Sequence, residues 1–107
     1  MDKKFLITGK RLVESFDLIG LQELYQDIIT YESEYRLPKE YLYQQIFLHA
    51  CQYNFVEAIS FLFQVYQSMD IIQKKALRQL FFYGKYLLDK EYHQWYSKNI
   101  IKDIRVQ

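Results

Sequence analysis

Residues that break or cross-link a chain are scarce in this sequence. The 107 residues include three Gly, one Pro and one Cys, whereas average usage gives about 12% Gly and Pro together. All-β sandwiches and barrels need a turn signal every ~8–12 residues, so this scarcity excludes them. Half of the residues are apolar, which excludes a disordered chain. The length suits one domain, residues 1–107, with a core of its own.

The single cysteine, Cys51, excludes an intramolecular disulfide and is typical of a reducing compartment. The first residues hold only three consecutive apolar side chains, whereas a signal peptide needs ~7–15 of them. The longest uncharged run, residues 41–56, contains Gln, His and Asn and is too short and polar to span a membrane. The sequence therefore predicts a cytoplasmic protein without a membrane span. Export by a route without a cleaved signal stays open.

Capping signals divide the chain into six predicted helices. Asp17, Asn54, Asp70 and Asp89 each precede an apolar periodic stretch, and Asn54 and Asp70 are followed three residues later by Glu57 and Gln73, as in a capping box. Pro38 fits the first turn of the third helix. The apolar residues recur at helical spacing between these signals. The prediction is an all-α fold of about six helices in three antiparallel helix–turn–helix hairpins.

The spacing of the hairpins indicates stacked helical repeats. The turn markers Asp17, Asn54 and Asp89 lie 37 and 35 residues apart, and periods of about 20–50 residues are typical of such stacks. An irregular six-helix bundle has the same spacing, so both arrangements remain open.

Residues 48–63 resemble the helix–turn–helix core of an ankyrin repeat. Ala50 and Cys51 match its two small residues, Asn54 matches its turn glycine, and Val56, Ile59 and Leu62 match second-helix core positions. Residues 13–24 are similar to a more degenerate copy, so that the resemblance runs over residues ~10–66. Residues 80–92 are closer to a tetratricopeptide hairpin. The resemblance implies protein binding and no catalysis, although the Thr-Pro-Leu-His opening and the finger loop of ankyrin repeats are absent.

The sequence offers no constellation of catalytic or metal-ligating groups. His49 and Cys51 lie two residues apart on a predicted helix, so they point about 200° apart around its axis and cannot pair as base and nucleophile. His49, Cys51 and His93 have no zinc spacing. We expect no enzyme activity, no cofactor and no metal, and we expect Cys51 to be a buried small residue.

Charge is distributed unevenly along the chain, with net charges of +3 over residues 1–11, −6 over 12–57 and +4 over 58–107. Such a pattern suits an oriented partner or head-to-tail self-association, because charges steer docking. It is also compatible with ordinary solvated helix faces.

The 20 aromatic residues divide into two sets. Six lie in line with the apolar stripes and are predicted to pack in the core: Phe16, Phe47, Phe55, Phe81, Tyr92 and Trp95. Seven tyrosines lie at helix ends or off the stripes: Tyr31, Tyr35, Tyr41, Tyr43, Tyr53, Tyr83 and Tyr86. Because tyrosine is enriched where proteins bind each other, the first five of these are the predicted protein-binding residues.

Basic and aromatic residues alternate in the last third of the chain, which is the pattern of an alternative function. Nucleic-acid binding would use the predicted helices of residues 74–105, through Lys74, Lys75, Arg78, Lys85, Trp95, Lys98 and Lys102. A pI near 7.8 and the acidic middle oppose this alternative. The favoured function is a non-catalytic protein-interaction module, an adaptor or effector-like protein. A homo-oligomer is also compatible with the aromatic content.

Overall fold

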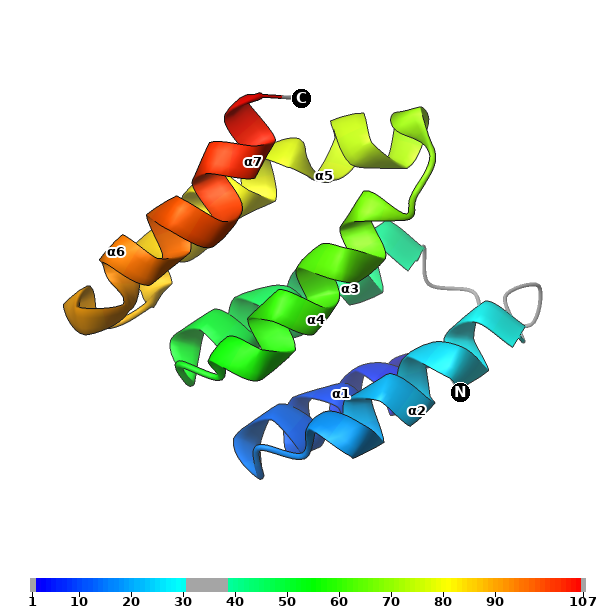
Figure 1. Ribbon diagram of the computed structural model, residues 1–107. Helices are drawn as coiled ribbons and strands as arrows, with labels where there is room; N and C mark the ends of the chain where they lie inside the picture. The colour runs from blue at the N-terminus through cyan, green and yellow to red at the C-terminus, as the bar shows by residue number, and fades with distance from the viewer. Residues whose placement is uncertain (1, 31–38, 107) are drawn as a thin grey trace.

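Three helical hairpins follow one another along the chain (Figure 1). The computed structural model describes residues 2–30 and 39–106, with side chains at 4–26 and 39–106. Five longer helices are α1 (Asp2–Glu14), α2 (Leu18–Thr30), α3 (Lys39–Gln52), α4 (Val56–Gln67) and α5 (Ile71–Gly84). The 3-10 turn η2 (Lys85–Leu87) ends α5, and a last helical arm combines η3 (Lys90–Tyr92), α6 (His93–Tyr96), the π-helical η4 (Ser97–Ile101) and α7 (Lys102–Arg105). The predicted all-α fold of six helices in three hairpins is confirmed.

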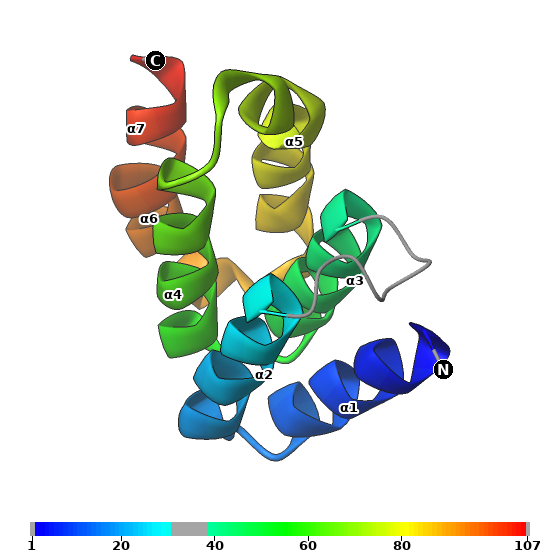
Figure 2. The same ribbon diagram turned by 90° about the vertical axis from the view of Figure 1, so that its right-hand side faces the viewer.

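The hairpins stack in chain order and form two layers (Figure 2). The first helices of the hairpins, α1, α3 and α5, lie side by side, with α3 in contact with both of the others. On the other side, α2 contacts α4, and the last helical arm completes the layer. All three turns between paired helices therefore lie at one end of the stack, and the connection from α4 to α5 lies at the other.

The first two hairpin turns have the same backbone geometry. Phe16 and Asn54 take left-handed conformations, with φ of 56° and 55°. In each turn the next residue donates its amide five residues back, from Asp17 to the Leu12 carbonyl and from Phe55 to the Ala50 carbonyl. This is the Schellman motif that ends a helix, usually with glycine in the left-handed position. The matching positions are thus 38 residues apart, and the part of the chain described here has no third positive-φ residue.

The capping predictions are correct for two helices and wrong for two others. Asp17 accepts a hydrogen bond from the Gly20 amide at 2.8 Å, and Asp70 forms a complete capping box with Gln73. Asn54 does not cap α4, because its left-handed conformation makes it the residue that ends α3, and Phe55 takes the N-cap position without a side-chain bond. Asp89 stands at the N-cap position of η3 but its carboxylate does not cap. The prediction for Pro38 lies outside the described residues.

Asn54 and Asp89 join the turns of the second and third hairpins. The Asn54 Oδ1 atom accepts from the Asp89 backbone amide at 2.9 Å, and the Asn54 Nδ2 atom donates to Asp89 Oδ2 at 3.1 Å. Two bonds between the same residues hold the second turn against the third. Both side chains are therefore directed toward the neighbouring turn.

The buried residues of all three hairpins form one core cluster. The predicted apolar stripes of α3 and α4 are fully confirmed, since all their members are buried: Leu42, Ile46, Phe47, Ala50, Cys51, Phe55, Ala58, Ile59, Leu62 and Tyr66. Two packing predictions are wrong. Phe16 is 55% exposed, because the left-handed turn carries it to the edge of the core, where its ring lies 5.1 Å from the ring of Phe55. The helical spacing of α5 also groups Ala76 with the apolar residues Leu77, Leu80 and Phe81, but Ala76 faces solvent.

Gly84 lets the end of α5 approach α3 closely. A Cβ atom at this position would lie 2.9 Å from the ring of Phe47, 3.0 Å from the Tyr96 hydroxyl oxygen and 3.1 Å from Cys51 Sγ. The ring and the hydroxyl are held in place, since Tyr96 donates a hydrogen bond to the Phe81 carbonyl. Any side chain larger than that of glycine would therefore push the third hairpin away from the second.

Replacement of Asn54 tests the pair of hydrogen bonds that joins the second and third turns. Asn54→Ala loses both hydrogen bonds to Asp89. It also places alanine at positive φ, where the Cβ atom is strained and no polar side chain compensates. We therefore expect a loss of about 2–3 kcal/mol in the free energy of unfolding. Asn54→Gly loses the same bonds but suits the backbone, and should lose about 1 kcal/mol. Urea denaturation of both variants measures the difference. Equal losses for Ala and Gly would contradict the conformational part of this explanation.

Candidate functional site

The first helices of the hairpins form one continuous face with a groove across it. The groove has a volume of about 270 Å³. Its lining residues come from α1, α3, α5 and η2: Lys10, Gln45, Leu48, His49, Gln52, Tyr83 and Leu87. We call these seven residues the α1/α3/α5 groove. Because the groove crosses all three hairpins, it depends on their stacking and not on any one helix.

His49 lies at the centre of the polar contacts beside this groove. Its Nε2 atom lies 2.8 Å from Glu14 Oε2 of α1, and its ring lies 4.7 Å from the ring of Tyr53. Lys10, which also lines the groove, precedes Glu14 by one helical turn, so the two opposite charges lie on the same face of α1. The arrangement ties α1 to α3 at the surface and holds the Tyr53 ring in position.

The structure places the five predicted protein-binding tyrosines differently. Tyr41 and Tyr53 are exposed, at 42% and 40%. The prediction that Tyr43 lies at the surface is wrong. This side chain is 1% exposed, and its hydroxyl donates a hydrogen bond to the Leu62 carbonyl in the core. Tyr31 and Tyr35 lie outside the described residues.

Sequence reasoning missed most of the groove, although a signal for it was present. Gln45, Leu48 and Gln52 recur at i, i+3 and i+7 of α3, inside the uncharged run of residues 41–56. A polar stripe without charges, opposite a fully apolar stripe, is typical of a helix face that is only partly solvated. Tyr83, at 60% exposure, was among the off-stripe tyrosines but was not assigned to a site.

The predicted nucleic-acid-binding residues divide between two neighbouring grooves beside α5. Lys74, Lys75 and Arg78 line a groove of about 460 Å³ with Tyr66 and Ile71. Lys85 and Lys102 line another of about 380 Å³, together with six further residues: Phe82, Tyr86, Ser97, Ile101, Arg105 and Val106.

The two grooves meet where the Arg78 guanidinium lies over the Phe82 ring, at 5.5 Å from its centre. Of the other predicted residues, Trp95 packs partly against the core with its ring 6.3 Å from that of Tyr96. Lys98 is exposed and lines neither groove. The bases of α5 and α7 therefore gather on one face, without Trp95.

The groups with chemical reactivity do not converge in the described part of the chain. Cys51 is completely buried, as predicted from its place on the apolar stripe, and it is separated from the surface ring of His49. No group of three or more His, Cys, Asp or Glu side chains within residues 4–26 and 39–106 is placed to hold a metal ion. His93 contacts the Leu88 carbonyl at 3.0 Å and serves the last turn.

Comparison of the chain with protein families, with curated proteins and with solved structures finds no match. The resemblance to ankyrin and tetratricopeptide repeats therefore stays a prediction. Among the helices described here, none combines the length and the apolar character that crossing a membrane requires.

The Cys51 thiol should resist alkylation in the folded protein. Burial raises the pKa of this thiol above its ordinary value, so at pH 8 the thiolate fraction is below that of a free cysteine, and the Sγ atom has no access to reagent. We expect iodoacetamide to modify Cys51 only in molecules that have transiently unfolded. The modification rate should therefore equal the rate for unfolded chain multiplied by the unfolded fraction, which is about 10⁻³–10⁻⁶. Mass spectrometry with and without urea measures this, and rapid modification without urea would contradict the burial.

Proposed function

We propose that this protein is a non-catalytic interaction module that binds a protein partner through the α1/α3/α5 groove. The observation that carries the proposal is the joint contribution of all three hairpins to one groove. The positions of loops and single helices vary independently of one another, whereas a face built from the stacked first helices of the hairpins keeps a constant shape. Such a face is suited to recognition of a long segment of another chain.

The side chains of the groove fit a protein partner. Gln45 and Gln52 offer amide donors and acceptors to a partner backbone, while Leu48 and Leu87 offer apolar contact between them. Tyr53 and Tyr83 stand exposed beside or in the groove, and tyrosine is enriched in the energetically dominant part of interfaces. Tyr41 precedes Gln45 by one turn of α3, which extends the same face toward the other end of the stack.

Position-specific photo-crosslinking tests this function in cells that naturally produce the protein. A benzophenone amino acid at position 52 lies in the groove, and the matched control at exposed position 64 lies on α4 in the other layer. We expect a covalent adduct from position 52 and none from 64. With the captured partner purified, Tyr53→Ala and Tyr83→Ala should each raise Kd about tenfold.

Both tyrosine variants should fold, because surface substitutions cost little stability, and circular dichroism checks this. An adduct composed of two copies of the chain identifies the partner as the protein itself. Equal adducts from positions 52 and 64, or unchanged Kd in both tyrosine variants, would contradict the proposal.

Binding of single-stranded nucleic acid is the second candidate function. The observation that favours it is the gathering of Lys85, Lys102 and Arg105 around one groove beside the exposed ring of Tyr86. Cations beside an aromatic ring are the elements that bind a phosphate backbone and stack a base. Lys75 and Arg78 of α5 lie on one helical stripe that runs toward Lys85 at the start of η2, which continues the positive surface along the helix.

A labelled single-stranded oligonucleotide tests this candidate by fluorescence polarisation across a range of salt concentrations. The double variant Lys85→Gln with Lys102→Gln should lower the slope of log K against log salt by about 1.4, since each phosphate contact contributes about 0.7. Lys98→Gln is the control, because Lys98 is exposed on the same arm but outside both grooves. Absence of salt-dependent binding, or equal effects of all three lysines, would eliminate nucleic-acid binding.

A further inference from the structure

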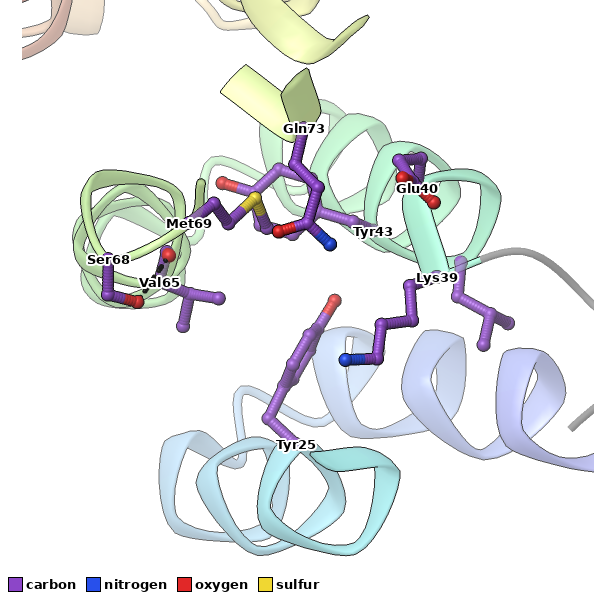
Figure 3. Close-up of a pocket in the computed structure, with 9 residues that line it drawn as sticks. Tyr25, Lys39, Glu40, Tyr43, Val65, Ser68, Met69 and Gln73 are labelled. Atoms are coloured by element: carbon purple, nitrogen blue, oxygen red, sulfur yellow. Dashed lines mark hydrogen bonds between the residues drawn. The ribbon is translucent and has the colours of Figure 1, made fainter. Parts of the chain in front are cut away.

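A separate cavity lies at the end of the stack where α4 is connected to α5, and Figure 3 shows the residues that line it. Its volume is about 170 Å³. The walls come from α2, from the start of α3, from the end of α4 and from the first turn of α5. The lining residues are Tyr25, Lys39, Glu40, Leu42, Tyr43, Val65, Ser68, Met69 and Gln73. None of them belongs to the α1/α3/α5 groove or to the basic grooves.

Tyr25 brings an unsatisfied polar group into this cavity. The side chain is 6% exposed, and its hydroxyl oxygen is buried without a hydrogen-bond partner among the described side chains, at residues 4–26 and 39–106. Two other buried tyrosines, Tyr43 and Tyr96, each donate to a backbone carbonyl. A buried polar group without a partner costs about 1–3 kcal/mol, so the Tyr25 hydroxyl differs from those of Tyr43 and Tyr96 in having a hydrogen bond to offer a ligand.

The geometry shows where such a partner would sit. The Tyr25 hydroxyl points from α2 into the middle of the cavity, and the Gln73 side chain enters from the opposite wall (Figure 3). Burial raises the pKa of this hydroxyl, so it stays protonated and is a hydrogen-bond donor at any physiological pH. The complementary group on a ligand is an oxygen acceptor.

Two other polar groups of the cavity are already engaged. The Ser68 hydroxyl donates to the Val65 carbonyl at 2.7 Å, and Gln73 Oε1 accepts from the Asp70 amide at 3.4 Å. Lys39 takes part in an interaction of its own, and because Glu40 is the other charged residue of the lining, the formal charges of the lining sum to zero. A charged ligand would lose its hydration without a matching countercharge. The remaining wall is apolar and includes Leu42, Val65 and Met69.

The volume sets the size of the ligand. An apolar cavity of about 150 Å³ holds benzene, and this one is slightly larger at about 170 Å³. We propose that the cavity binds a small neutral organic molecule, about the size of a monosubstituted benzene, through a carbonyl oxygen that accepts a hydrogen bond from Tyr25. This binding site is independent of the proposed interaction module.

A cycle of two probes and two proteins isolates the proposed hydrogen bond. Acetophenone carries the carbonyl, and ethylbenzene has nearly the same size without it. Amide chemical shifts around Leu42, Val65 and Met69, followed by NMR during titration, give Kd for each probe. The ratio of Kd for ethylbenzene to Kd for acetophenone should fall by about 2–10-fold in Tyr25→Phe. Because the difference in solubility between the probes is the same for both proteins, it cancels when their ratios are compared.

Two controls keep the experiment interpretable. Tyr41→Phe, an exposed tyrosine at the same end of α3, should leave the ratio unchanged. Tyr25→Phe should fold at least as stably as the parent, because it removes only an unsatisfied hydroxyl. If it fails to fold, Val65→Phe provides the second variant, since it fills the cavity from a half-buried position and should weaken both probes together.

Several results would overturn the proposal. The first is the absence of amide chemical-shift changes with either probe at millimolar concentration. The second is an unchanged ratio of the two Kd values in folded Tyr25→Phe. The third is tighter binding of benzoate or benzylamine than of acetophenone. A water molecule as the only partner of the Tyr25 hydroxyl, detected by water–protein NOE without probe binding, would also overturn it. So would a protein carbonyl bonded to that hydroxyl in the free protein.

Discussion

The packing of Phe81 is the interaction on which the assembly of the hairpins depends. Its ring contacts Tyr43 and Phe47 of α3 and Phe63 and Tyr66 of α4, with centroid distances from 4.5 to 6.4 Å. A single residue of the third hairpin therefore meets both helices of the second. Aromatic pairs of this kind add about 0.5–1.5 kcal/mol each beyond the area that they bury. The close approach at Gly84 and the bonds between Asn54 and Asp89 lie at the turn end of the same interface.

Every proposed site follows from this stacking. The α1/α3/α5 groove exists because the first helices lie side by side, and the cavity at Tyr25 exists because α2 and the start of α3 do not close completely against the end of α4 and the start of α5. One basic groove lies between Tyr66 of α4 and the first half of α5, and the other lies between the end of α5 and the last helical arm. Protein binding, nucleic-acid binding and small-molecule binding are thus assigned to three different surfaces, and experiments on one leave the others undisturbed.

Helical periodicity predicted the elements well but predicted polar contacts poorly. Leu42, Ile46 and Phe47 were assigned to the core from their spacing, because a helix face that is apolar in the sequence must be buried to be stable. Asn54 shows the opposite case. It has the sequence pattern of a capping box, yet a left-handed backbone and a bond to Asp89, 35 residues away, give it another role. Local pattern could not anticipate a partner that only the third hairpin supplies.

The sequence by itself determined the class of fold, the number of helices and most of the core, since these depend on composition and on periodicity within each helix. The tertiary structure decided which side chains of an amphipathic helix share a surface. Tyr43 and Tyr53 were equivalent in the sequence, yet the first is buried and the second is exposed beside His49. The tertiary structure likewise left the Tyr25 hydroxyl without a hydrogen-bond partner among the described residues, while giving one to the Tyr96 hydroxyl. The physical reason is that solvent exposure and hydrogen bonding depend on neighbours from other hairpins, whose positions are set by packing and not by the local sequence.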